Sequence, residues 1–137
     1  MFSKIMTPVD LAHVGTLERT LQCTADLAAH YRAPVVFVGV TAGTPGSVAH
    51  TPQEFAKKLD AFAREQGEKH GYEASGHAMT SKDPAIDLDP TLLKAVEETG
   101  ADLVVMATHP PNFRDYIWPS NGGYVAEHAK VSVLLVR

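Results

Sequence analysis

The segment VVFVGV, residues 35–40, is a nearly continuous run of apolar side chains. Two further runs of this kind, DLVVMA at 102–107 and VSVLLV at 131–136, follow later in the chain. Such runs are typical of parallel strands that helices cover on both faces, because neither face is left for polar residues. Together with two further segments they predict five strands: Ile5–Val9, Pro34–Val40, Ala74–Thr80, Asp102–Met106 and Val131–Val136.

Between these segments the apolar residues change to a helical period. They recur at spacings of three and four over residues 14–28 and again over 55–62, which indicates amphipathic helices. A third helix is expected to begin with Asp89 as its N-cap and Pro90 at its first position, and to stop at Gly100. Alternating strands and helices predict an α/β sheet of parallel strands joined by right-handed crossovers.

One strand and one connection have the composition of exposed positions. The strand Ala74–Thr80 carries Ser75, Gly76 and His77, so we expect it at an edge of the sheet. The link Thr41–Thr51 is rich in Gly, Pro and Ser and is expected to be mobile and exposed.

The composition favours a single-domain globular protein and argues against a membrane or nucleic-acid-binding protein. A chain of 137 residues with 45% hydrophobic and 20% charged residues is expected to form one domain over residues 1–137. No apolar run approaches the roughly 20 residues of a membrane span, and the first residues do not resemble a signal peptide. The single cysteine, Cys23, fits the reducing cytoplasm. The net charge of −4, without a Lys/Arg run, argues against a nucleic-acid partner.

Metal-binding and catalytic motifs are missing from the sequence. The seven histidines are scattered, and no cysteine cluster accompanies them, so a zinc site is not expected. Asp83, Asp87 and Asp89 lack the turn glycine and the terminal Glu of a calcium-binding EF-hand loop and are interpreted as acids at a helix start. There is no nucleophile elbow and no phosphate-binding P-loop, so we expect neither a structural metal nor catalytic residues.

The carboxyl ends of the strands are the expected ligand site. In an open parallel sheet, ligands bind beyond these ends, where the strand order reverses. The strand ends carry Pro8, Asp10, Val40, Ala107 and His109.

A short last helix, expected at about Asn121–Ala129, begins at the same edge. The free N–H groups of a helix start favour anions, and Ser120, Asn121 and Gly122 stand there. Ser and Asn also occur at such positions as simple helix caps. Both interpretations remain open.

Four stretches of the chain resemble the universal stress protein family. They are KIMTPVD at 4–10, HAMTSKDPAIDL at 77–88, GADLVVMATHPP at 100–111 and SNGGYVAEHAKVSVLLVR at 120–137. The resemblance covers essentially the whole chain in order. It implies a five-stranded parallel sheet of order 3-2-1-4-5 with helices on both faces, the adenine nucleotide alpha hydrolase-like fold.

Some members of that family bind ATP through a loop with three glycines followed by Ser or Thr. Laid on this chain, the glycine positions are Ala107, Pro110 and Pro119, and the hydroxyl position is Ser120. Proline removes a backbone donor and does not adopt positive φ, so we expect this loop to be a weaker phosphate site than a glycine loop.

The resemblance also assigns roles to residues. It makes Asp10 a partner of ribose or adenine, although Asp at this position also suits a helix cap. It gives Val40 a backbone role toward adenine, and His109 is a candidate cation unless it is a solvated loop residue.

Several functions stay open at this point. A dimeric stress-response protein that binds adenine nucleotides, ATP included, is the first. A scaffold of the same fold without nucleotide is the alternative, and a slow ATPase ranks below both because no carboxylate pair is evident for Mg²⁺. A flavodoxin-like electron carrier lacks the required loop after the first strand.

The last strand suggests how two copies associate. It is apolar and near a sheet edge, and such edges are normally paired or covered. The resemblance implies a symmetric homodimer through this strand, with Val131, Val133 and Leu135 at the interface.

Overall fold

The computed structural model describes residues 1–108 and 122–137. In chain order the elements are β1 (Ile5–Pro8), η1, a 3₁₀ helix (Leu11–Leu17), α1 (Glu18–Tyr31), β2 (Val35–Thr41), α2 (Pro52–His70), β3 (Ala74–Thr80), α3 (Pro84–Thr99), β4 (Leu103–Ala107), α4 (Gly122–His128) and β5 (Ser132–Val136).

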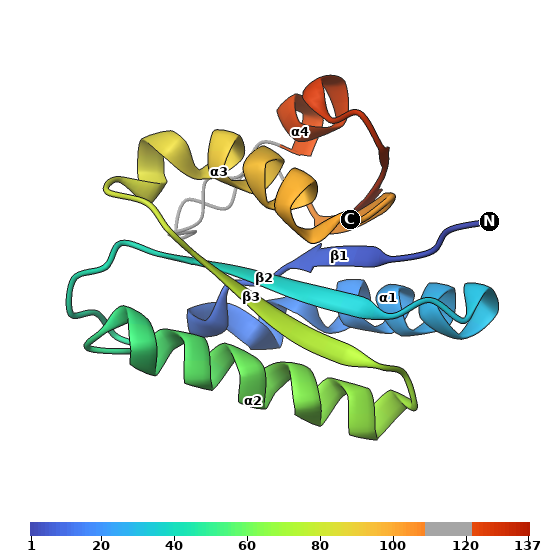
Figure 1. The fold of residues 1–137 in the computed structure, drawn as a ribbon, viewed down its shortest axis with the longest axis horizontal. Coiled ribbons are helices and arrows are strands. Elements are labelled where there is room, and N and C mark those ends of the chain that lie inside the picture. Colours follow the sequence, from blue (N-terminus) through green and yellow to red (C-terminus); the bar gives the residue numbers. More distant parts are fainter. Residues whose placement is uncertain (109–121) are drawn as a thin grey trace.

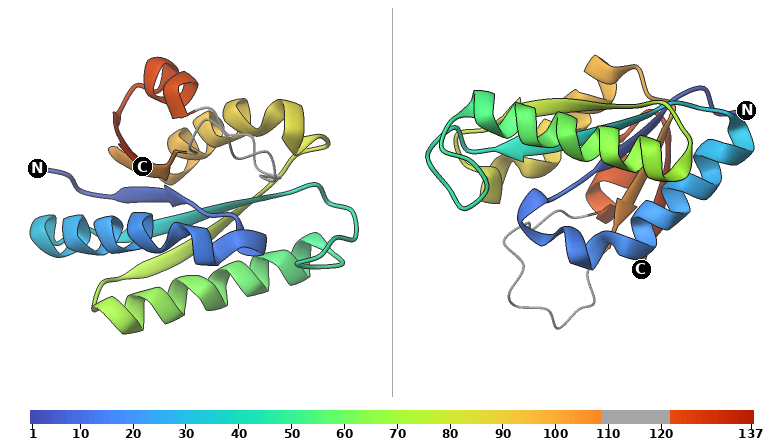
Figure 2. Two further views of the ribbon diagram at one scale, coloured as in Figure 1. Left: turned by 180° about the vertical axis from the view of Figure 1, so that it is seen from behind. Right: turned by 90° about the horizontal axis from the view of Figure 1, so that it is seen from below.

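The five strands form one parallel sheet of order β3-β2-β1-β4-β5. Helices α1 and α2 lie on one face and α3 and α4 on the other, as the views in Figures 1 and 2 show together. The predicted α/β class and strand order are therefore confirmed. Strands β3 and β5 form the two edges, as their sequences predicted.

Two apolar cores hold the layers together. Successive β2 residues alternate between them: Val35 and Phe37 pack toward α1 and α2, while Val36 and Val38 pack toward α3 and α4. All four of these side chains are almost fully buried. The continuous apolar run that opened the sequence is thus explained by burial on both faces of the sheet.

The third helix begins earlier than predicted. Neither Asp89 nor Pro90 starts it: α3 runs over Pro84–Thr99, and Pro90 lies inside it. The carbonyl of Asp83 accepts a hydrogen bond from the N–H of Asp87 (2.9 Å), so the first turn closes around Pro84. Proline is well suited to a first helical turn because its fixed φ is already helical.

Packing accounts for the helix continuing through Pro90. Leu88 and Leu92 lie on either side of it and are both buried against the sheet. Their burial offsets the missing backbone hydrogen bond of the proline.

Asp102 fixes the start of β1 beside β4. Its carboxylate accepts hydrogen bonds from the N–H groups of Ser3 (2.9 and 3.0 Å) and Lys4 (3.1 Å), and its own N–H donates to the Lys4 carbonyl (3.0 Å). Partial burial raises the pKa of the Asp102 carboxyl, but the N–H groups of Ser3 and Lys4 lower it by more, so this pKa lies below its ordinary value.

Among the described residues, no helix combines the length and the apolar composition that a membrane crossing requires.

We predict that Asp102→Asn lowers the free energy of unfolding at pH 7 by about 1 to 2 kcal/mol, because charge-assisted hydrogen bonds to Ser3 and Lys4 are weakened. Since the folded-state pKa of Asp102 is depressed, its stabilisation is complete above the unfolded pKa of about 3.9 and is lost as the pH falls through the folded pKa. Urea unfolding followed by circular dichroism at pH 7 and at lower pH measures both effects.

The matched control is Glu65→Gln, which removes one charge from an exposed position of α2. Equal losses of stability in the two variants, or a loss in Asp102→Asn that persists undiminished at the lower pH, would show that the carboxylate does not anchor β1.

Candidate functional site

The sheet opens at its carboxyl edge between β1 and β4. Strand β1 pairs with β2 as far as Pro8↔Val38, but its pairing with β4 consists of Ile5↔Leu103 and Met6↔Val104. The strand order reverses at this point, which is where ligands bind in open α/β sheets.

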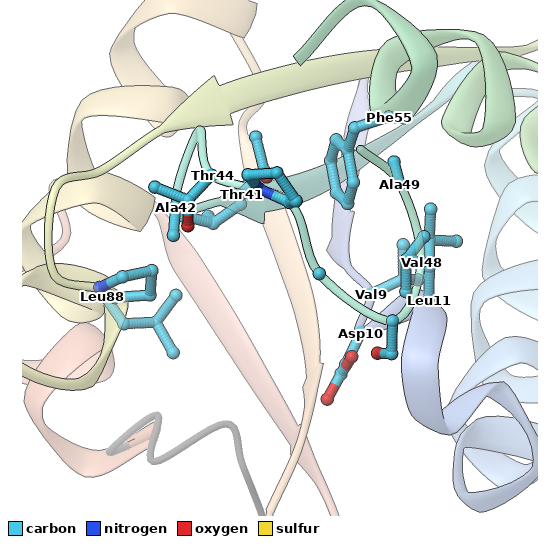
Figure 3. A pocket seen from close by; sticks show the side chains of 15 residues that line it. Val9, Asp10, Leu11, Thr41, Ala42, Thr44, Val48, Ala49, Phe55 and Leu88 are labelled. Atoms are coloured by element: carbon cyan, nitrogen blue, oxygen red, sulfur yellow. The ribbon is translucent and has the colours of Figure 1, made fainter. Parts of the chain in front are cut away.

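A cavity of about 240 Å³ lies at this edge, beside the ends of β1 and β2 (Figure 3). Most of its wall is apolar, with a few hydroxyl groups and one carboxylate. Its lining residues are Val9, Asp10, Leu11, Val40, Thr41, Ala42, Thr44, Pro45, Gly46, Ser47, Val48, Ala49, Phe55, Pro84 and Leu88. An apolar cavity with a few placed polar groups is typical of a small-molecule site.

Asp10 supplies the carboxylate of the cavity and also caps η1. Its Oδ1 accepts a hydrogen bond from the N–H of Ala12 (3.0 Å), and its Oδ2 lies 2.8 Å from Nδ1 of His13. The side chain is only 18% exposed. A carboxylate has about four acceptor positions, so these two contacts orient the group and leave acceptor capacity for a ligand hydroxyl or amine.

Val40 offers backbone groups to the same space. The Val38 carbonyl accepts from Val9 on the β1 side, whereas the Thr41 carbonyl accepts from Ser81 on the β3 side. Alternation along a parallel ladder therefore directs the N–H and carbonyl of Val40 toward the β1 side, beyond Pro8, the last residue of β1. A donor and an acceptor at this spacing match the edge of a nucleobase.

The connection from β2 to α2 lines one side of the cavity. We call residues 42–50 the strap. Residues 44–47 are exposed, as predicted for this link, but Val48 packs on the core and Ala49 is only 8% exposed. The prediction that the whole link is exposed is wrong at Val48 and Ala49, because their apolar side chains pack against the core cluster that α1, α2 and the sheet form. Residues 41–43 are half-buried as well.

Three other predicted site residues lie at this edge without lining the cavity. Pro8 is buried at the end of β1. Its backbone nitrogen is directed toward β4, but the pairing of β1 with β4 ends before Pro8. The missing N–H of the proline therefore costs no hydrogen bond of the sheet. Ala107 ends β4. A Cβ atom on Gly122 would lie 2.7 Å from Leu135 Cδ2 and 3.5 Å from Thr108 Cγ2, so Gly122 lies beside the end of β4.

The candidate nucleotide-binding residues His109, Ser120 and Asn121 lie outside the described residues. Pro110 and Pro119, which replace loop glycines, lie outside them as well.

The structure adds lining residues that the sequence reasoning missed. They include Phe55 from α2, Leu88 from α3 and the strap residues Thr44, Ser47 and Ala49. Figure 3 shows Leu88 across the opening from Leu11 and Val48. The apolar pair Val48-Ala49 ahead of the Thr51-Pro52 helix start was the available signal that the strap folds back onto the protein.

Within residues 1–108 and 122–137, no group of three or more His, Cys, Asp or Glu side chains is arranged to hold a metal ion.

Strand β5 presents apolar side chains at the opposite end of the sheet from β3. Val131 and Val133 are half-buried, and Leu134 and Leu135 are 38% and 36% exposed. The predicted interface residues Val131, Val133 and Leu135 therefore lie at an accessible sheet edge.

Comparison with known proteins places this chain among relatives of one family. The model of the universal stress protein family matches residues 1–137. Universal stress protein G of Shigella flexneri is 26% identical over 151 aligned positions, which cover 100% of both chains. A universal stress protein structure from Archaeoglobus fulgidus has a TM-score of 0.72 at 20% identity over 100% of both chains. A second structure from Archaeoglobus fulgidus, in complex with dAMP, has a TM-score of 0.67 at 21% identity over 98% of both.

We predict that Asp10→Ala lowers the free energy of unfolding by about 1 kcal/mol, because the cap on the Ala12 N–H is lost. Asp10→Asn keeps an acceptor oxygen and is expected to lose less than half of that amount. Thermal unfolding of the two variants beside the unmodified protein measures the difference. An Asp10→Asn variant as unstable as Asp10→Ala would mean that the charge, rather than the cap, stabilises η1.

Proposed function

Because the chain belongs to the universal stress protein family, we propose that it is a regulatory protein of the stress response that binds an adenine nucleotide at the carboxyl edge of its sheet. The observation that carries the proposal is that Asp10 and Val40 line one cavity. A carboxylate suits the ribose hydroxyls, and the backbone edge of Val40 suits the base.

The size of the cavity suggests that it holds only the nucleoside part of a nucleotide and that the phosphates lie outside it. At about 240 Å³ it is smaller than the roughly 300–1,000 Å³ of pockets that enclose a whole ligand. It is therefore assigned the nucleoside part. The phosphates of AMP, ADP or ATP are assigned to the loop between Ala107 and Gly122, through Ser120, Asn121 and His109.

The dAMP complex of the Archaeoglobus fulgidus relative supports this choice of ligand class. The single free cysteine, Cys23, suits a reducing compartment, and we propose a cytoplasmic location.

A scaffold protein without nucleotide is the second candidate. It is favoured by one feature of the sequence: Ala107, Pro110 and Pro119 occupy all three positions where nucleotide-binding members of the family carry glycine. Phosphate would then lack the close backbone approach that glycine permits.

We predict that calorimetric titration with ATP, ADP and AMP, with and without Mg²⁺, detects binding in the low micromolar range. Asp10→Asn is expected to weaken it roughly tenfold, because a charge-assisted hydrogen bond to the ligand is reduced to a neutral one. Asn is preferred to Ala here because it retains the helix cap.

Glu65→Gln serves again as the control, since it removes a charge far from the cavity lining. If no binding is detected up to millimolar nucleotide, the scaffold function is favoured. If phosphate is released steadily over hours, the protein is instead a slow ATPase.

We further propose that the protein is a homodimer that pairs through β5. Support comes from the exposed apolar edge, because an unpaired edge strand of this composition favours association. A two-fold contact is also the commonest oligomeric arrangement.

We predict a dimer in size-exclusion chromatography with light scattering at micromolar concentration. Leu135→Glu is expected to raise the dimer dissociation constant by roughly tenfold or more, because it brings two like charges together across the two-fold axis. Leu134→Glu is the matched control, since Leu134 is equally exposed but points to the other face of β5. A monomeric unmodified protein would remove the proposal, and equal effects of the two substitutions would remove the assigned face.

A further inference from the structure

The strap is attached to the protein at one end by side chains of α2. The Nζ of Lys58 donates a hydrogen bond to the Val48 carbonyl, and the N–H of His50 donates to Oε2 of Glu54 (3.2 Å). Lys58 and Glu54 also form an ion pair, with Nζ 3.4 Å from Oε1. Two backbone groups of the strap, on either side of Ala49, are thus satisfied by one helix turn of α2.

Further hydrogen bonds constrain the backbone around this attachment point. The carbonyl of Ala49 accepts a hydrogen bond from the N–H of Gly46 (2.9 Å), which closes a tight turn in the strap. Thr51 caps α2 by accepting from the N–H of Glu54 (3.1 Å), which fixes the backbone of Glu54 relative to the strap. The N–H of His50 is the main cause that lowers the pKa of Glu54 below its ordinary value, and Lys58 adds to the lowering.

The strap also forms a large part of the cavity wall. Residues 42 and 44–49 supply nearly half of the cavity lining. Lys58 lines a second groove of about 440 Å³ together with Leu11 and Ala12 of η1 and Ser47 and Val48 of the strap. Lys58 therefore stands where α2, the strap and the segment after Asp10 come together.

We propose that Lys58 is a positioning residue that latches the strap over the cavity and so sets how long a bound nucleotide stays. This inference rests on the proposed function, because it assumes that the cavity takes the nucleoside part. A ligand in the cavity would contact the strap, because strap residues supply nearly half of the lining, and movement of the strap away from the cavity would remove those contacts. Lys58 resists that movement through the Val48 carbonyl, and it does so without touching the ligand.

The variant Lys58→Met keeps the aliphatic length of the side chain and removes the donor. The control is Lys57→Met, which removes the same charge from the neighbouring exposed position of α2. Hydrogen exchange of the intact protein without nucleotide reports on the strap directly. We expect peptides covering residues 42–50 to exchange several-fold faster in Lys58→Met and at the unmodified rate in Lys57→Met.

Stopped-flow release of a fluorescent AMP analogue measures the consequence. The dissociation rate of the analogue is expected to rise roughly fivefold in Lys58→Met, because one partly exposed hydrogen bond is lost. In Lys57→Met the rate is expected to stay unchanged. Faster exchange together with faster release supports the latch.

Three results overturn it, and they are distinguishable. Unchanged strap exchange in Lys58→Met shows that the hydrogen bond does not hold the strap. Faster exchange with unchanged nucleotide release shows that the strap does not control residence. If the unmodified protein does not bind the nucleotide, the proposed function is wrong, and so is the proposal that Lys58 sets how long the nucleotide stays bound.

Discussion

Backbone hydrogen bonds from β1 to β2 on one side, and to β4 on the other, hold the sheet together at its centre. Strand β1 is only four residues long, and each of these residues is buried. Asp102 adds to this constraint, because its carboxylate binds the N–H groups of Ser3 and Lys4 and thereby sets where β1 enters the sheet. The position of every other strand follows from β1.

The shortness of β1 is also what creates the site. Its pairing with β4 stops at Met6↔Val104, while β2 continues to Thr41. The backbone of Val40 therefore extends past the end of β1, and Asp10 turns the chain into η1 beside it. The strap supplies nearly half of the lining of the resulting cavity, and Ala49 anchors it on the core. Because β1 is short, the Asp10 carboxylate, the backbone of Val40 and the strap lie together around one cavity.

The sequence predicted the parts that depend on local pattern. Apolar runs such as residues 35–40 located the strands, and the strand ends then placed Asp10 and Val40 at one edge. The start of α3 was missed because the Asp-Pro pairs at 83–84 and 89–90 carry the same local start signal, and burial of Leu88 against the sheet, which favours the first pair, is not visible in that pattern. The role of the strap was missed because it depends on contacts with α2, which no local pattern encodes.

The central claim is that the nucleoside of an adenine nucleotide occupies the cavity between Asp10, Val40 and the strap. Titration of the ¹⁵N-labelled protein with AMP, followed by amide NMR spectra, tests it most directly. The account predicts that the largest shifts fall on residues 9–11 and 40–49, with small changes at β3 and along the C-terminal half of α2. Spectra unchanged at millimolar AMP, or shifts concentrated on a surface away from the cavity, would contradict it.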